Sequence, residues 1–348
     1  MKLNVPFRTK QEVVPLIDAG ADELYCGYLS GQWRKRFTSL EFERKGGESN
    51  FTDVDELRQA VELAHRRGVP VSLAINGLYV KNQYDLLLTI VRSLARVDLD
   101  AFIVADLGLL LTLRKMGFKK KIHISTGGTV FNTEACRFYK ELGAARIILD
   151  RQMSLGSMRA LARGHPDMEF EAFILNTLCV YIDGFCTFMH SYGSGSVEDI
   201  PIKKSSKQVP MKLLSVYDLR SRLDACCFTY SIQAYDVRLK KTVGLDRARP
   251  GFFKQQVDAV ECGACALYDL KNAGVMSLKI VGRQYSPEKR LADTKFIRSA
   301  LHMLGRNTRI SKENFARRVR ALYRKTYDYK SPCRGNNCYY PQAGRGYA

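Results

Sequence analysis

The sequence predicts an α/β protein: a (β/α)8, TIM-barrel-like parallel barrel with an insertion between strands 7 and 8 and a basic helical C-terminal extension. Short apolar runs alternate with longer segments in which apolar residues recur every three or four positions, which is typical of β-α units around a parallel sheet. Eight such runs are present, the number that closes a barrel. At 348 residues and 46% hydrophobic content, the chain can bury the large core that this fold requires.

Each predicted strand is a short run rich in apolar residues. The eight runs are 3–6, 23–27, 69–76, 101–105, 121–125, 146–149, 168–174 and 277–281. Amphipathic helical patterns lie between them, for example in residues 53–68 and 83–98. Gly68 is expected to end the first of these helices.

Residues that directly follow the strands are the candidates for function, because chemistry in a closed parallel barrel belongs on the loops after the strand C-terminal ends. These positions include Gly27, Asn76, Asp106, Gly127, Gly128, Arg151, the segment around Asn176, and Arg283. The guanidinium groups of Arg151 and Arg283 suit a dicarboxylate or a phosphate, or an ion pair within the protein. His123 and Asp106 are the nearest acid/base candidates, and each is also typical of a hydrogen-bonded structural residue.

The sequence divides into four parts. Residues 1–185 form the first part of the barrel, 186–274 a cysteine-bearing insertion over the barrel mouth, 275–305 the last strand and helix, and 306–348 the basic extension with a cysteine-containing tail. The insertion opens with the polar stretch GSGSVEDIPIKKSSKQ, typical of a flexible loop, and continues with the β-like run YSIQAYDVRLKK.

The charge of the chain suggests a polyanionic partner. Lys and Arg number 55 against 35 Asp and Glu, a formal net charge of +20, and this excess favours RNA as the partner. In residues 315–330, six basic residues alternate with Tyr323, Tyr327 and Tyr329, so cations can neutralise phosphates while tyrosines stack on unpaired bases. The alternative is a helix whose apolar face, which includes Phe315, packs on the barrel.

The chemical role of the cysteines depends on the compartment of the protein, which is expected to be the cytoplasm. No run approaches the roughly 18 to 20 apolar residues of a membrane span, and the N-terminal residues lack the apolar core of a signal peptide. Thiols stay reduced in the cytoplasm, so the ten cysteines favour metal or redox chemistry over disulfides. The alternative for any one cysteine is a role as a small buried apolar residue, which is expected of Cys136 in its helical pattern.

Six cysteines form the sharpest motif of the sequence. Cys179 and Cys186 follow a predicted strand, Cys226 and Cys227 are adjacent, and Cys262 and Cys265 form a C-x-x-C. Thiolate is the matching ligand for sulfide-bridged iron, and a fold can gather distant cysteines around one cluster. The C-x-x-C alone is equally consistent with half of a zinc site, a redox pair or two core residues.

Several longer segments together resemble one known family. They are AGADELYCGY, NFTDVDELRQAVELAHRRGVPVSLAIN, ISTGGTVFNTEACRFYKELGAARIILDRQMSL, EAFILNTLCVYIDGFC and AGVMSLKIVGR, within about residues 3 to 300. On these motifs the chain resembles the collagenase-like peptidase family, number thirty-two of the unknown-type peptidases. The resemblance implies a barrel-like fold and, as in members studied as metalloproteins, an oxygen-sensitive 4Fe-4S cluster held by four cysteines.

The cluster ligands implied by the resemblance are Cys179, Cys186, Cys227 and Cys262. Cys262 matches the family's last cysteine by its distance from AGVMSLKIVGR, so it is preferred to Cys265. Cys227 is preferred to Cys226 because the run that begins at Tyr235 then falls where the family has an equivalent run.

Two sites depart from the family pattern. Leu175 and Asn176 stand where the family usually has a His-Gly pair, and Val281 stands where it usually has the glutamate of S-L-K-I-E-G-R. An imidazole and a carboxylate are thereby lost, which affects the expected chemistry more than the expected cluster. The tail adds Cys333 and Cys338, which either join Cys265, Cys226 or Cys26 in a second metal site or are incidental thiols of a mobile terminus.

The leading hypothesis is an oxygen-independent hydroxylase, or a related modifying enzyme, that acts on RNA (tRNA or rRNA) or on a quinone precursor. The resemblance implies prephenate as the oxygen donor of several relatives, and a second family subunit as a partner. The family's name implies a peptidase as the alternative, but the sequence shows no Ser/His/Asp motif and no H-E-x-x-H spacing. A third hypothesis is a non-catalytic scaffold that binds RNA or another partner around a structural cluster.

Overall fold

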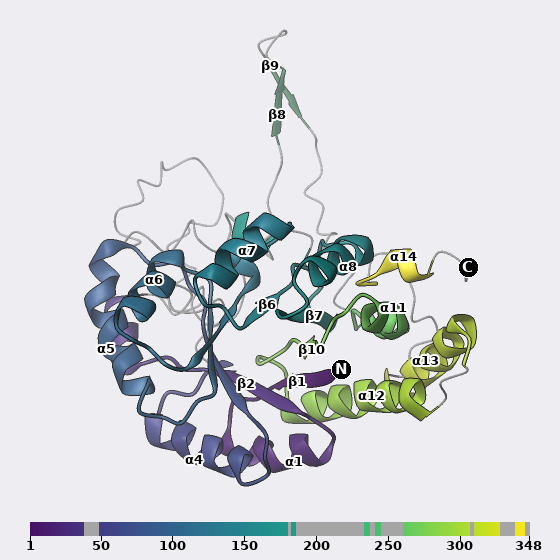
Figure 1. Ribbon diagram of the computed structural model, residues 1–348, viewed down its shortest axis with the longest axis horizontal. Helices are drawn as coiled ribbons and strands as arrows, with labels where there is room; N and C mark the ends of the chain where they lie inside the picture. The colour runs from purple at the N-terminus through teal and green to yellow at the C-terminus, as the bar shows by residue number, and fades with distance from the viewer. Residues whose placement is uncertain are drawn as a thin grey trace.

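The computed structural model of the chain describes residues 1–37, 49–179, 182–185, 233–236, 241–244, 260–306, 310–327 and 338–344. Most of these residues belong to one closed barrel of parallel strands with helices around it (Figure 1). The predicted α/β barrel is therefore confirmed.

All eight predicted strands are present, and their bounds differ from the prediction by at most two residues at either end. They are β1 (Lys2–Pro6), β2 (Glu23–Gly27), β3 (Val71–Ile75), β4 (Ala101–Val104), β5 (Lys121–Ile124), β6 (Arg146–Ile148), β7 (Glu169–Leu175) and β10 (Ser277–Ile280). Around the barrel they follow the order β1-β10-β7-β6-β5-β4-β3-β2. The first and last strands close the ring, with Lys2 opposite Ser277.

The C-terminal ends of parallel strands lie together at one end of a closed barrel. We call this end, formed by the loops that directly follow the eight strands, the mouth. Because β10 lies next to β1 in the ring, residues that are far apart in the sequence meet at the mouth.

Helices surround the barrel, most of them between successive strands in the chain and the last three after β10 (Figure 1). They are α1 (Val13–Asp18), α2 (Gly31–Arg36), α4 (Val54–His65), α5 (Tyr84–Leu94), α6 (Leu107–Lys115), α7 (Thr133–Glu141), α8 (Leu155–Gly164), α11 (Leu267–Asn272), α12 (Pro287–Arg306), α13 (Lys312–Tyr327) and α14 (Pro341–Gly344). Side-chain caps begin several of them; for example, Asn132 Oδ1 accepts a hydrogen bond from Ala135 N at 2.8 Å. The predicted end at Gly68 is confirmed by its φ of 70°, a conformation that favours glycine.

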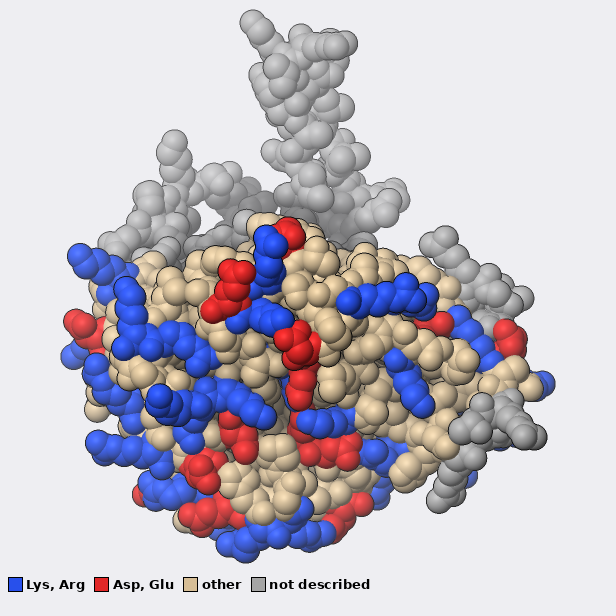
Figure 2. Space-filling model, in the orientation of Figure 1, with Lys and Arg blue, Asp and Glu red and all other residues tan. Residues whose placement is uncertain are grey.

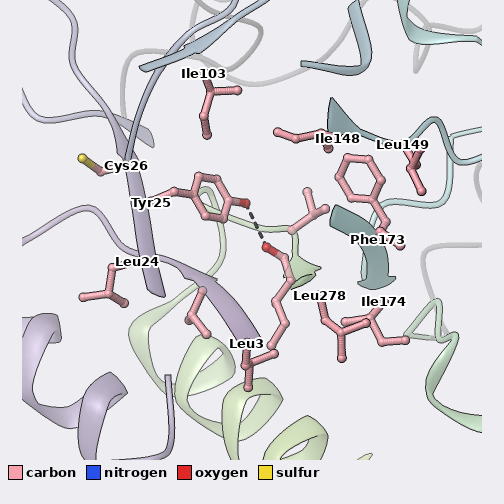
Figure 3. Packing of buried hydrophobic residues seen from close by; sticks show 14 of the residues in the cluster. Leu3, Leu24, Tyr25, Cys26, Ile103, Ile148, Leu149, Phe173, Ile174 and Leu278 are labelled. Atoms are coloured by element: carbon pink, nitrogen blue, oxygen red, sulfur yellow. Dashed lines mark hydrogen bonds between the residues drawn. The ribbon is translucent and has the colours of Figure 1, made fainter. Parts of the chain in front are cut away.

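Apolar side chains from neighbouring strands pack closely in the core. Figure 3 shows this packing around Tyr25, with Ile103, Phe173 and Leu278 among its neighbours, and each of these four is at most 5% exposed. The Tyr25 hydroxyl donates to the carbonyl oxygen of Ile280 at 2.9 Å, so its one polar group is satisfied inside the core.

A largely buried charge cluster joins four strands of the barrel, β2, β6, β7 and β10. Its ionised members are Glu23, Arg146, Glu169, Glu171 and Lys279. The carboxylate of Glu171 is fully buried and lies 2.8 Å from both Arg146 Nη1 and Lys279 Nζ. Burial alone raises the pKa of Glu171, but the two cations reverse this effect and hold the pKa well below its ordinary value. The carboxylate therefore stays ionised inside the barrel.

The basic extension folds as α13, and its apolar face packs against the body of the protein. Phe315 and Val319 are almost completely buried, and Tyr323 is only 2% exposed. The prediction that Tyr323 stacks on bases is wrong, because its ring lies 5.8 Å from that of Phe296 in α12. Tyr329 lies outside the described residues. The exposed cations of α13 are Arg317, Arg318, Arg324 and Lys325.

Part of the insertion is described. The β-like run contains β8 (Gln233–Asp236), which pairs antiparallel with β9 (Lys241–Gly244). The polar stretch that opens the insertion lies outside the described residues. No helix in the described part of the chain is long and apolar enough to cross a membrane.

Candidate functional site

Arg151, which follows β6 at the mouth, is held in place by a buried ion pair. Its side chain is 9% exposed, and Nη1 contacts the carboxylate of Asp183, which also accepts a hydrogen bond from the Thr126 hydroxyl. Burial lowers the pKa of the Arg151 guanidinium, but the negative groups around it, Asp183 first among them, together more than offset this effect, so the pKa is raised and the group stays charged. The guanidinium carbon lies 4.0 Å from the centroid of the Phe173 ring. Nε of Arg151 has no hydrogen-bond partner among the described residues.

Arg283 follows β10 on another side of the mouth and is 5% exposed. Its Nη1 donates to Asn50 Oδ1 at 2.8 Å. Gly27, at the end of β2, leaves the space for this pair, since a Cβ there would lie 1.8 Å from the arginine nitrogen and 1.9 Å from the amide oxygen. Burial raises the pKa of the Tyr25 hydroxyl, and the charges of Arg283 and Arg151 oppose the rise. Both predicted arginines therefore act on the same side chain.

Two of the four predicted cluster cysteines lie on segments that pair at the mouth. Cys179 comes four residues after Leu175, the last residue of β7. Cys262 pairs with Leu175 in an antiparallel bridge. The pairing is supported by a hydrogen bond from Asn176 N to the carbonyl oxygen of Glu261, at 2.8 Å. The fold thus brings together two cysteine-bearing segments that are far apart in the chain.

The remaining cysteines are buried, or belong to the alternative ligand choice, or lie outside the described residues. Cys186, Cys226, Cys227 and Cys333 lie outside the described residues. Cys26 is buried in β2, and Cys136 is buried in α7 as predicted. Cys265, the alternative to Cys262, has its Sγ 3.8 Å from the carbonyl oxygen of Ala316 in α13.

The C-terminal segment 338–344 adds a third cysteine to this region. Cys338 pairs with Cys262 in a parallel bridge. The next residue continues the contact, because Tyr339 N donates to the carbonyl oxygen of Cys262 at 3.2 Å. The segment that carries Cys262 therefore lies between the end of β7 and the tail.

The described thiols fit part of a metal centre but do not complete one. Among the described residues, no three of His, Cys, Asp and Glu lie close enough to hold a metal ion. A centre at the mouth would therefore need cysteines from outside that part of the chain, such as Cys186 and Cys227. Cys179 and Cys262 supply the soft donors that sulfide-bridged iron prefers.

The backbone that leads into Cys179 is strained. Asn176 and Thr177 have φ values of 65° and 51°, a region that asparagine tolerates and a β-branched residue rarely adopts. Asn176 is held by its side chain, which donates to Val281 O at 2.9 Å and to Asp293 Oδ2 at 2.8 Å, and accepts from Lys289 Nζ at 2.9 Å. Strain of this kind persists where the surroundings hold it, as at many functional sites.

The two positions that depart from the family resemblance are apolar core positions here. Leu175 is fully buried and Val281 is 7% exposed. Asn176, which stands at the position of the family's glycine, adopts the left-handed conformation that glycine permits. The backbone at the signature is thus compatible with the resemblance, while the imidazole and the carboxylate are absent from these two positions.

The two acid/base candidates lie among structural contacts. His123 is 5% exposed inside β5, where burial and the charge of Arg146 lower its pKa to about 3, so its imidazole is neutral at neutral pH. Asp106 caps α6, and its Oδ1 accepts from Leu109 N at 2.6 Å and from the Tyr84 hydroxyl at 2.7 Å. A catalytic role for either residue stays a prediction.

The structure also brings residues to the mouth that the sequence analysis missed. Asp183 lies within EAFILNTLCVYIDGFC, so a closer reading of that motif could have found it. Glu261 Oε2 accepts from Thr177 N at 3.1 Å, and burial raises the pKa of this carboxyl. No local signal marks Glu261 or Asn50, because their partners are distant in the chain.

Comparison with known proteins gives one family. A model of peptidase family U32 matches residues 8–208. An uncharacterized protease of Methanocaldococcus jannaschii is 31% identical over 180 residues, which cover 51% of this chain and 40% of the relative. The tRNA hydroxylation protein P of Helicobacter pylori is 28% identical over 170 residues, covering 49% and 38%. A collagenase of Porphyromonas gingivalis is 23% identical over 207 residues, covering 56% and 46%. The chain thus matches less than half the length of each relative.

Proposed function

Because this chain belongs to peptidase family U32, we propose that it is a tRNA-modifying enzyme, an oxygen-independent hydroxylase that depends on a 4Fe-4S cluster. Similarity to a protein named tRNA hydroxylation protein P supports the substrate class. The observation that carries the proposal is the pairing of the Cys262 segment with the end of β7, next to Cys179, at the mouth that holds Arg151 and Arg283.

Cys179, Cys186, Cys227 and Cys262 are the proposed cluster ligands. When bound, the cluster supplies electron transfer, the property that thiolate ligands and nearby charges tune. Arg151 contributes a positive charge close to Cys179, since the two groups interact electrostatically. A cation beside a cysteine favours the thiolate that binds metal.

Arg151 and Arg283 are proposed to bind the oxygen donor, a dicarboxylate such as prephenate. Guanidinium groups bind carboxylates through charge-assisted and often bidentate hydrogen bonds. Burial strengthens such bonds because water is excluded. Nε of Arg151 is a buried donor without a partner in the described part of the chain, and the rings of Phe173 and Tyr25 line the same region.

RNA binding is proposed to use the excess of positive charge. Figure 2 shows Lys and Arg side chains spread over one face of the protein, with Asp and Glu among them. The exposed cations of α13 add a local basic strip, made of Arg317, Arg318, Arg324 and Lys325. Contacts of this kind neutralise phosphates without reading sequence, so the choice of nucleotide belongs to the mouth.

Peptidase activity is the second candidate, because two relatives are named as a protease and a collagenase. The contacts of the described histidines do not favour it. His65 Nε2 lies 2.9 Å from Asp100, and His165 Nε2 lies 2.9 Å from the carbonyl oxygen of Thr133. Neither imidazole contacts a nucleophile there.

The proposal is tested by anaerobic purification followed by analysis of tRNA. We expect about four irons and four sulfides per chain. In a strain that lacks the gene, mass spectrometry should show one tRNA nucleoside lighter by one oxygen atom, and the wild-type gene should restore it. Iron-free protein together with unchanged tRNA would refute the proposal, and hydrolysis of gelatin by the purified chain would favour the peptidase.

The arginine site is tested by Arg283→Lys with Arg298→Lys as its control. Lysine keeps the charge at position 283 but cannot form the two-pronged contact, so we expect tRNA hydroxylation to fall at least tenfold while iron content stays unchanged. Arg298 binds Gly20 O at 2.8 Å, ahead of β2 and at the opposite end from the mouth. Its replacement should leave hydroxylation near the wild-type level.

A further inference from the structure

Cys338 and Cys262 are directly paired residues of two parallel segments. Directly paired residues send their side chains to the same face, and neighbouring strands lie about 5 Å apart. The two thiols therefore leave one face side by side. Cys262 is also paired, through its backbone, with the end of β7, so all three segments belong to one small patch of sheet.

Two buried tyrosines hold the tail in this register. The Tyr339 hydroxyl donates to the carbonyl oxygens of Asn176 and Thr177, the second at 3.1 Å. The Tyr340 hydroxyl donates to the carbonyl oxygen of Phe173 at 2.6 Å. Both rings are at most 4% exposed. Contacts on both sides of the β7 end thus fix the position of Cys338 relative to the segment that leads to Cys179.

The charged guanidinium of Arg151 lies close to this patch. Arg151 interacts with the Cys179 thiol and with the Tyr339 hydroxyl, and its charge also reaches Tyr340. The buried guanidinium is therefore shared by the signature cysteine and by the tail residues next to Cys338.

We propose that Cys338 is one of the four thiolate ligands of the metal centre at the mouth, next to Cys262. The inference rests on the proposed function, because it requires a thiolate-bound cluster there. Because a cluster of four irons takes one cysteine per iron, Cys338 stands in place of Cys186 or Cys227 in the set of four that the family resemblance implies, and it gives the tail a role in closing the site. Cys265 does not share this geometry, since its Sγ faces the Ala316 carbonyl oxygen in α13.

The test measures iron, acid-labile sulfide and visible absorbance in full-length protein purified without oxygen. We expect Cys338→Ala to lose at least half of the iron, as Cys262→Ala does, while Cys265→Ala keeps the wild-type amount. Tyr340→Phe removes one tail contact but keeps the thiol, and it should also keep its iron. If Cys338→Ala retains full iron and absorbance, or if Tyr340→Phe loses as much iron as Cys338→Ala, Cys338 is not a ligand.

A second measurement needs no variant. Wild-type protein is alkylated with iodoacetamide before and after its iron is chelated, and each cysteine is followed by mass spectrometry. We expect alkylation of Cys338 to become at least tenfold faster after chelation, while the rate at Cys265 changes little. An unchanged rate at Cys338 in iron-loaded protein would overturn this inference alone. Wild-type protein that never holds iron would overturn both it and the cluster of the proposed function.

Discussion

Position 27 shows how closely one residue can be constrained by its neighbours. Unlike Gly68, Gly27 has no positive φ, so the reason for glycine is space rather than backbone conformation. Arg283 Nη1 and Asn50 Oδ1 occupy the volume where a Cβ would stand. The end of β2 thus determines where the positive charge of Arg283 can lie at the mouth.

Gly27→Ala should therefore displace Arg283 from Asn50. We expect the free energy of unfolding to fall by about 1–3 kcal/mol, the usual cost of overpacking a buried site, as measured by urea denaturation. Gly31→Ala is the control, because nothing lies within 4 Å of a Cβ at that position. It should leave stability unchanged or raise it by up to about 1 kcal/mol. Equal stabilities of the two variants would contradict this account.

At the scale of the element, α13 has a buried apolar face and an exposed basic face. Its apolar residues pack on α12, where the rings of Tyr323 and Phe296 meet, and its exposed face carries arginines. The sequence pattern alone was consistent with both packing and RNA binding. The structure shows the packing and leaves the cations exposed, so the two interpretations are compatible.

Removing the exposed cations of α13 should weaken RNA binding without changing stability. For the triple variant Arg317→Ala, Arg318→Ala, Arg324→Ala, we expect the dependence of log Kd for tRNA on log salt to become shallower by about two to three units. The matched control replaces Arg66, Arg92 and Arg96, exposed arginines at α4 and α5, which Figure 1 places away from α13. Identical salt dependence of the two triple variants, measured by filter binding, would exclude α13 as an RNA contact.

The elements that could be predicted are those whose signal is local. Runs such as Ala101–Val104 and the amphipathic pattern of α4 depend on neighbouring residues only, so their positions followed from the sequence. The contact of Cys338 with Cys262 is different, because it joins segments that no local pattern relates. The strand of His123 was predicted, but its environment could not be, since that comes from Arg146 and Glu171 on other strands. Cys186 and Cys227 lie outside the described residues, so the four-cysteine ligand set stays a prediction.

At the scale of the whole molecule, the closed ring encloses ionised groups that no single element could hold. Glu171 of β7 is neutralised by Arg146 of β6 and Lys279 of β10, and Glu23 of β2 contacts the same arginine. Burying a charge without such partners is costly, and losing one partner leaves the others uncompensated. The stability of the barrel therefore depends on this cluster as a unit.

His123, next to this cluster, should make stability depend on pH. Its pKa is about 3 in the folded protein and about 6.5 in an unfolded chain, so only the unfolded state takes up its proton between these values. Above pH 6.5 His123 is neutral in both states and does not reduce the free energy of unfolding. As the pH falls from 6.5 towards 3, protonation of the unfolded state progressively lowers this free energy. From pH 7 to pH 5 we expect the free energy of unfolding to decrease by about 2 kcal/mol more than in His123→Asn.

Urea denaturation at pH 5, 6 and 7 measures this difference directly. The control is His302→Asn, since His302 is exposed on α12, and this variant should follow the wild-type curve. Parallel curves for wild type and His123→Asn would show that His123 is not buried as a neutral imidazole.

The pairing of β1 with β10 also has a consequence for biosynthesis. While the chain is being translated, Lys2 emerges from the ribosome long before its partner Ser277, so the sheet keeps two open edges until β10 has been made. The tail that covers the end of β7 arrives later still. During that interval the segment that carries Cys179 has neither the Cys262 segment nor residues 338–344 beside it. On the proposed function, a cluster would be inserted most easily before residues 338–344 dock.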